Sequence, residues 1–143
     1  MEKEEVALAG EFLLCFGGES SGLRARSRKW CDRLVGLPMR GRVGSLNVAT
    51  AAADTLGAAG LFVLAPAYYM PGYEALTPTP AAPHIVIVHG WGDEVVPAAN
   101  SIRWAQAHGA ELHLIRGDHR LADRLTAINR LFDGFLQYVP AAT

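Results

Sequence analysis

Short apolar runs alternate with amphipathic segments along most of the chain. Continuous runs of β-branched and other apolar residues stand at 60–66 (GLFVLAP) and 84–90 (HIVIVHG). This pattern is typical of parallel strands that are covered on both faces. Shorter apolar runs predict further strands at 11–16, 32–39 and 111–117.

The segments between these runs have helical character. Residues 45–57 are rich in alanine, and Ser45 is a suitable N-cap while Gly57 is a suitable stop. Further helices are predicted at 23–31, 98–109 and 121–139.

Five strands and four helices in alternating order predict an α/β fold. We expect a three-layer α/β/α sandwich with a five-stranded, mainly parallel sheet, Rossmann-like or flavodoxin-like, in a single domain over 1–143. Ligands of such folds bind beyond the carboxyl ends of the strands. Residues 67–83 interrupt the alternation with four prolines and predict a long surface loop that could form one wall of a pocket.

The charge and the cysteine content bear on which partners and which cell compartment the sequence predicts. The net charge is −1, so no overall field would hold a polyanion, but seven of the 13 cationic residues cluster between Arg24 and Arg42. This cluster is either a solvated helix face with its loop or a contact for RNA phosphates. We expect a cytoplasmic protein for three reasons. The two cysteines have no metal or redox spacing, the N-terminus is acidic, and no apolar run is long enough to span a membrane.

Three motifs near the N-terminus have a family-specific order and spacing. They are GGESSGL (17–23), CDRLVGLPMRG (31–41) and SLNVATAA (45–52). Residues 12 to about 50 therefore resemble the second half of the SpoU-type (SPOUT superfamily) RNA 2′-O-ribose methyltransferases. In that family these loops wrap S-adenosylmethionine inside a knotted backbone. The resemblance implies a cofactor pocket lined by Gly18, Glu19, Gly22, Leu37, Met39, Ser45, Leu46 and Asn47.

The first half of that family, with its catalytic arginine, is absent. More than 80 residues follow the helix that would be knotted, and threading so much folded chain would be slow. We therefore expect an unknotted chain without an intact cofactor site and without methyltransferase activity.

Three motifs in the rest of the chain point to another family. They are GLFVLAPAYYMPGY (60–73), IVIVHGWGDEVVP (85–97) and LHLIRGDHRL (112–121). Residues 48 to about 138 resemble the C-terminal half of a small α/β-hydrolase. The resemblance implies that Asp93 and His119 are the acid and histidine of a catalytic triad. A buried carboxylate would orient the imidazole while it deprotonates a nucleophile.

The nucleophile has two candidates. The family would place a G-x-S-x-G elbow directly before residues 48–50, where this chain has VGSLNVAT. Ser20 lies in GESSG, which fits the pattern but also fits the cofactor loop, and Ser45 precedes the correct helix but also fits an N-cap. The other histidines have no metal-ligand company, so no metal is expected.

The two resemblances meet at 48–50, which suggests a chimera of two α/β half-domains, 1–50 and 51–143. The first hypothesis for the function is that the chain is a folded chimera without a complete active site and with at most weak esterase activity. The alternatives are a remnant that binds S-adenosylmethionine or RNA, and a natural hydrolase with a rebuilt elbow. Exposed apolar edges would favour a homodimer.

Overall fold

The computed structural model describes residues 25–29, 58–80 and 82–139. The chain divides into two compact units, residues 1–38 with 141–143 and residues 39–140. In the first unit the described part is the short helix α1 (Ala25–Arg28) and Lys29, inside the predicted helix 23–31. Three predicted elements lie outside the described residues: the strands 11–16 and 32–39 and the helix 45–57. The unknotted path of the chain also concerns residues outside the described ones, and the single domain stays a prediction.

The described part of the second unit is built on a parallel sheet. Three strands, β1 (Gly60–Leu64), β2 (His84–Gly90) and β3 (Glu111–Ile115), lie in that order and pair in parallel register. They coincide with three of the five predicted strands. The α/β class and the parallel pairing are confirmed for the described residues, whereas the five-strand count remains a prediction.

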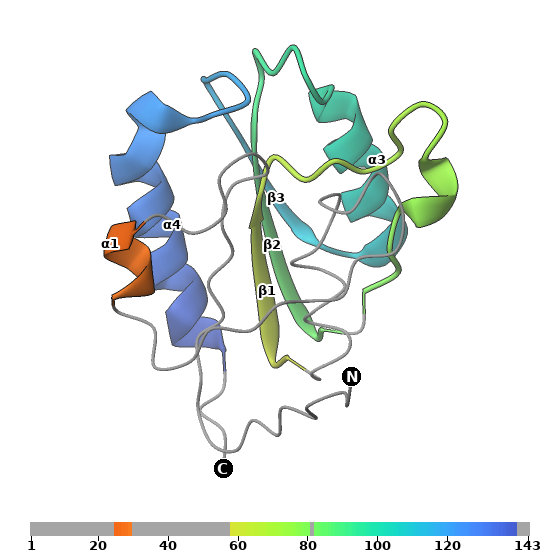
Figure 1. Ribbon diagram of the computed structural model, residues 1–143. Coiled ribbons are helices and arrows are strands. Elements are labelled where there is room, and N and C mark those ends of the chain that lie inside the picture. The colour runs from red at the N-terminus through yellow and green to blue at the C-terminus, as the bar shows by residue number, and fades with distance from the viewer. Residues whose placement is uncertain (1–24, 30–57, 81, 140–143) are drawn as a thin grey trace, which may run out of the picture. The chain divides into compact units, whose positions relative to one another are not determined.

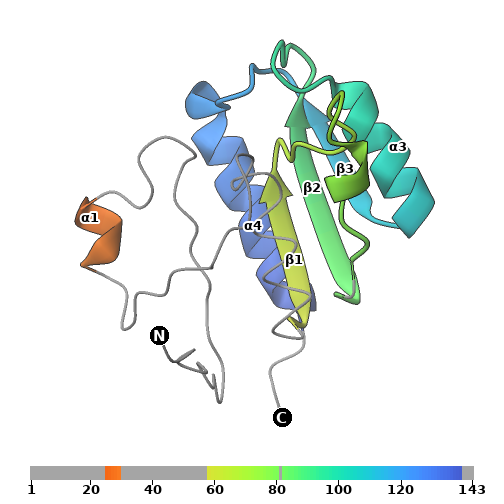
Figure 2. The ribbon, with the colours of Figure 1, turned by 45° about the vertical axis from the view of Figure 1, so that its right-hand side comes forward.

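Two long helices cover the two faces of this sheet. Helix α3 (Ala98–His108) lies on one face and α4 (Leu125–Tyr138) on the other, as Figures 1 and 2 show from two directions. Alternate strand residues serve the two faces: Leu61 and Ile87 pack with Trp104 of α3, whereas Val88 packs with Ile128 of α4. On the α4 face, Phe62 of β1 also contacts the rings of Phe132 and Phe135, with centroids 5.2 and 5.4 Å away.

The predicted loop 67–83 is attached to α3. The Tyr68 ring is fully buried and stacks on Trp104 with centroids 4.4 Å apart. Trp104 Nε1–H donates to the carbonyl oxygen of Pro78 at 2.9 Å, and Asn100 Nδ2–H donates to that of Tyr68 at 2.8 Å. The loop contains one short 3₁₀ turn, η1 (Glu74–Leu76). Much of its path is therefore determined by contacts with one helix.

The last helix begins later than the pattern predicts. Leu121 has a left-handed backbone (φ 51°), the 3₁₀ turn η2 (Ala122–Arg124) follows, and α4 begins at Leu125. Asp118 Oδ1 accepts hydrogen bonds from the N–H groups of Arg120 and Leu121, both at 3.0 Å, and so forms a turn before the helix. Among the described residues, no helix has the length and apolarity needed to cross a membrane.

Candidate active site

The loops that follow β2 and β3 lie side by side because the two strands are parallel neighbours. Both strands end at the same edge of the sheet, shown at the top of Figure 1. Trp91 N–H donates to the carbonyl oxygen of Ile115, and Gly92 N–H donates to that of Gly117, both at 2.9 Å. These two hydrogen bonds join the loop that carries Asp93 to the loop that carries His119.

Glycine is required where these loops meet. A Cβ atom on Gly90 would lie 2.4 Å from the carbonyl oxygen of Gly117 and 2.7 Å from that of Asp118. Real Cβ atoms essentially never come within 3.0 Å of such atoms. The missing side chain of Gly90 therefore sets how closely the two loops approach.

Asp93 is a buried carboxylate held on both of its oxygens. Its side chain is 0% exposed, and Oδ1 accepts hydrogen bonds from the N–H groups of Val95 at 2.9 Å and Val96 at 2.8 Å. Oδ2 lies 2.8 Å from Nδ1 of His119. Burial acts to raise the pKa of Asp93, but the hydrogen bonds from Val96, His119 and Val95 outweigh it and hold the pKa below the ordinary 3.8. Asp93 is thus a fixed negative charge at neutral pH.

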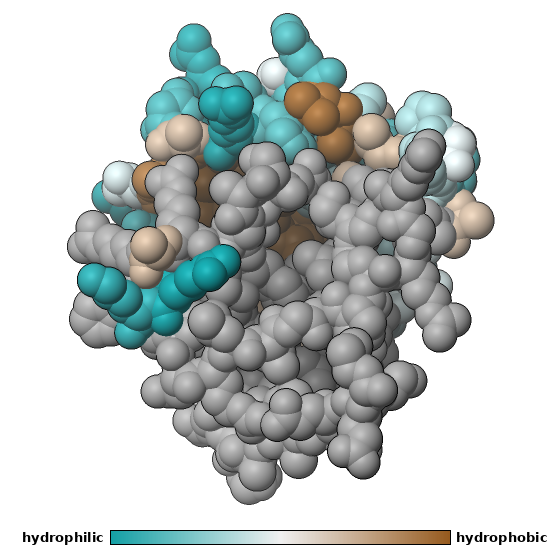
Figure 3. Space-filling model, in the orientation of Figure 1, coloured by the Kyte–Doolittle hydropathy of each residue, from teal (hydrophilic) through white to brown (hydrophobic). Residues whose placement is uncertain are grey.

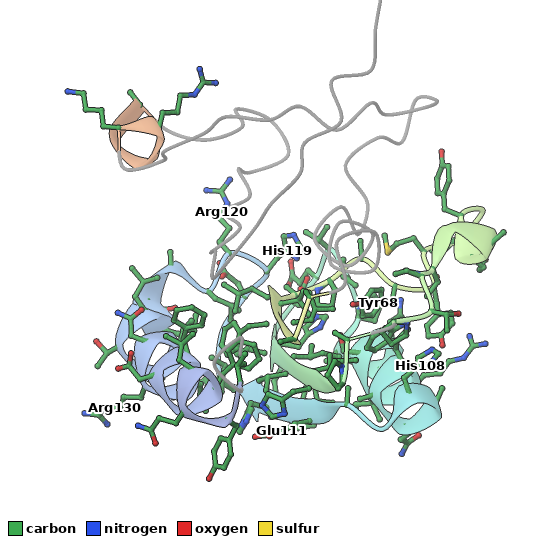
Figure 4. The ribbon with its side chains drawn as sticks, turned by 90° about the horizontal axis from the view of Figure 1, so that it is seen from below. Tyr68, His108, Glu111, His119, Arg120 and Arg130 are labelled. Carbon is green, nitrogen blue, oxygen red and sulfur yellow. The ribbon has the colours of Figure 1, made fainter. Side chains whose placement is uncertain are left out.

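His119 presents its second ring nitrogen away from the carboxylate. Because the ionised Asp93 can only accept, the proton between the two residues belongs to Nδ1 of His119, and Nε2 is left as a base. The His119 side chain is 31% exposed, and Nε2 has no hydrogen-bond partner within the described part of the chain. Figure 4 shows His119 over the sheet, between the two helices, whereas Arg120 points outward. A pair with this geometry has the chemistry to take a proton from a hydroxyl group, and such a role for Asp93 and His119 stays a prediction.

A second histidine, His89, also lies against this carboxylate and was not singled out from the sequence. It is fully buried in β2, with Nε2 at 3.0 Å from Asp93 Oδ2. A histidine at the end of an apolar strand, four residues before an aspartate, was the available signal. The pattern of 84–90 alone did not show on which side of the strand this ring lies.

The surroundings of the pair are polar with two exposed apolar side chains. Trp91 and Val95, on either side of Asp93, are 62% and 60% exposed. Figure 3 shows mainly hydrophilic side chains at this end of the molecule, with apolar ones among them. Trp91 is therefore a surface residue beside the pair rather than a packing residue.

Both candidate nucleophiles, Ser20 and Ser45, lie outside the described residues. So do all eight residues of the implied cofactor pocket, Gly18, Glu19, Gly22, Leu37, Met39, Ser45, Leu46 and Asn47. Within residues 25–29, 58–80 and 82–139, no cluster of three or more His, Cys, Asp or Glu side chains could hold a metal ion.

The N-terminal part of the chain is similar to known methyltransferases. A model of the SpoU rRNA methylase family matches residues 2–56. The 23S rRNA (guanosine-2′-O-)-methyltransferase RlmB of Xylella fastidiosa is 51% identical over 49 residues, and that of Xanthomonas axonopodis pv. citri is 49% identical over 51 residues. These stretches are 34% and 36% of this chain but only 20% of either relative. The chain therefore spans about a fifth of the length of the curated relatives it matches.

A solved structure gives a different similarity. A candidate hydrolase of the alpha/beta superfamily from Xanthomonas campestris pv. campestris shares 39% sequence identity and a TM-score of 0.55 with this chain. The similarity covers 62% of this chain and 50% of that one, so about half of the hydrolase-like protein is matched. The SpoU-type similarity of the N-terminal part and the similarity to an alpha/beta hydrolase-like chain are confirmed, whereas the predicted bounds of the hydrolase-like part, 48 to about 138, stay a prediction. The joining of two families in one chain and the catalytic roles of the site residues stay predictions.

Proposed function

We propose that the chain is a composite of two α/β half-domains with no complete active site, and that its activity is at most weak hydrolysis of activated esters. The hydrogen bond between Asp93 Oδ2 and His119 Nδ1, 2.8 Å long, carries this proposal. The match to SpoU methylases over residues 2–56 and the likeness to half of a hydrolase-like chain support the composite origin.

In this proposal His119 acts as a general base. Its Nε2 removes a proton from a water molecule as the water oxygen attacks the ester carbonyl carbon. The bond to the leaving alkoxide then breaks, and the proton on Nε2 passes to that oxygen. Asp93 stays ionised, holds the imidazole in the tautomer that leaves Nε2 free, and stabilises the imidazolium that forms.

Hydrolysis of p-nitrophenyl acetate by the full chain tests the proposal. We expect the rate above buffer to fall by about 10²-fold in His119→Ala, the lower end of what general acid–base catalysis contributes. His113→Ala is the matched control, because His113 is a partly exposed β3 residue that contacts Glu111 rather than Asp93. Equal rates in the native chain and His119→Ala would remove the enzymatic part of the proposal.

Binding of S-adenosylmethionine or RNA is the second candidate function. The match to SpoU methylases favours it, and the basic cluster from Arg24 to Arg42 would contact RNA phosphates. In that case Gly18, Glu19, Gly22 and the other residues of the implied pocket would hold the cofactor. Calorimetry with millimolar S-adenosylmethionine decides: a saturable heat supports a retained cofactor site, and the absence of heat excludes it.

A further inference from the structure

The general-base mechanism leaves His89, a fully buried imidazole, without a role. His89 contacts the loop that follows β2 and helix α3. Its Nε2 lies 2.9 Å from the carbonyl oxygen of Val96 and 3.0 Å from Asp93 Oδ2. Its Nδ1 lies 2.6 Å from Oγ of Ser101, a fully buried residue of α3.

These contacts determine where the His89 proton is. Nε2 faces two oxygens that can only accept, the Val96 carbonyl and the ionised Asp93, so the ring proton belongs on Nε2. Nδ1 is then the acceptor for the hydroxyl proton of Ser101.

Two imidazoles therefore lie against one carboxylate oxygen: His119 Nδ1 is hydrogen-bonded to Asp93 Oδ2, whereas the hydrogen bond of His89 Nε2 goes to the Val96 carbonyl and its approach to Oδ2 is a close polar contact. Asp93 Oδ2 lies 3.0 Å from His89 Nε2 on the buried side and 2.8 Å from His119 Nδ1 on the open side. The two rings differ in exposure: the His89 side chain is 0% exposed and that of His119 is 31% exposed. The buried ring cannot reach a substrate, but it can hold the oxygen that the exposed ring uses.

We propose that His89 is a positioning residue, whose Nε2–H ring Ser101 holds in place and which fixes Asp93 Oδ2 for His119. The backbone N–H groups of Val95 and Val96 hold Oδ1, so a contact on Oδ2 from the buried side restricts rotation of the carboxylate. Without His89, Oδ2 would depend on His119 alone. The consequence for catalysis rests on the proposed function, but the positions of the protons do not.

Nuclear magnetic resonance of the full chain with ¹⁵N-labelled histidine tests this proposal without any substrate. Ring ¹⁵N shifts identify which nitrogen of each histidine carries a proton, and single His→Gln variants assign the signals. We expect a proton on Nε2 of His89 and none on its Nδ1. A proton on His89 Nδ1 in the native chain would overturn the proposal.

The effect on His119 is measured by exchange of its Nδ1 proton with water. In His89→Leu we expect this exchange to accelerate by about tenfold or more, because the acceptor oxygen is less well held. His89→Gln carries an amide donor near the position of Nε2 and should recover most of the loss. His113→Gln is the surface control and should leave the exchange unchanged.

Ser101→Ala provides a milder variant if His89→Leu does not fold. Removing the hydroxyl deletes the donor to Nδ1 but leaves both acceptors at Nε2, so we expect the proton to stay on Nε2, the His89 ring to be held less firmly, and the His119 proton to exchange faster. Exchange at the native rate in folded His89→Leu, or in Ser101→Ala, would show that His89 is only a core residue. A failure to hydrolyse esters would affect the proposed function and leave these signals in place.

Discussion

The contact at Gly90 makes a quantitative prediction about the whole site. In Gly90→Ala the new methyl group would start 2.4 Å from the carbonyl oxygen of Gly117. That atom is backbone, so no side chain can rotate away. Ordinary contact begins near 3.4 Å, so the loop with His119 must retreat by about 1 Å.

The energy follows from the same geometry. A shift of this size lengthens the His119–Asp93 hydrogen bond from 2.8 Å to beyond the range in which such bonds contribute. Forcing a methyl group into a close-packed site costs about 1–3 kcal/mol, and the lost hydrogen bond adds about 1 kcal/mol. We expect Gly90→Ala to lower the free energy of unfolding by about 2–4 kcal/mol.

Urea unfolding of three glycine variants provides the assay. Gly92→Ala would place its Cβ 3.1 Å from Gly117 O, a tighter contact than usual but a relievable one, so its effect should be smaller. Gly134, inside α4, has no heavy atom within 4 Å of the added Cβ, and Gly134→Ala should stabilise the helix by about 1 kcal/mol. A Gly90→Ala protein that unfolds at the same urea concentration as the native chain would refute the close approach of the two loops.

Two further predictions concern Asp93 and the core. Because the pKa of Asp93 is lowered in the folded state, its stabilising contribution is complete above the ordinary pKa of 3.8, which applies to the unfolded chain, and is lost as pH falls through the lower folded-state pKa. In Asp93→Asn the side-chain NH₂ group would face an N–H donor of a ring or of the backbone in either orientation of the amide. The difference in unfolding free energy between the native chain and Asp93→Asn should therefore be largest at neutral pH and become smaller below about pH 4. A gap independent of pH would contradict this. Trp104→Phe loses the hydrogen bond to the Pro78 carbonyl and packing at a fully buried site, so it should lower the free energy of unfolding in urea by about 1–3 kcal/mol. The control is Trp91→Phe: Trp91 is 62% exposed, so this variant should change the free energy of unfolding by less than about 0.5 kcal/mol.

The described strands show how far hydrophobic pattern determines structure. β2 has the predicted bounds, His84–Gly90, because it is the middle one of the three described strands and both of its faces are buried. β1 ends at Leu64, two residues early, because Ala65 adopts a left-handed backbone (φ 42°). The pattern of apolar residues does not record such a turn.

Sequence reasoning found only some of the residues that the structure brings together at the site. Asp93 and His119 stand at strand ends, so parallel pairing alone brings them to one edge of the sheet. His89 is part of an apolar run, and its role depends on contacts with Ser101, 12 positions later on a helix, which no local pattern reveals. The nucleophile candidates Ser20 and Ser45 remain predictions for the same physical reason, because their distance from His119 depends on tertiary packing.

Labelling with a fluorophosphonate probe tests the central claim most directly, since the probe reacts with a serine hydroxyl only when a neighbouring base activates it. The account of an acid–histidine pair without its nucleophile predicts no covalent adduct by mass spectrometry of the intact chain. A stoichiometric adduct that disappears in Ser20→Ala or Ser45→Ala, and also in His119→Ala, would contradict it and establish a complete serine hydrolase.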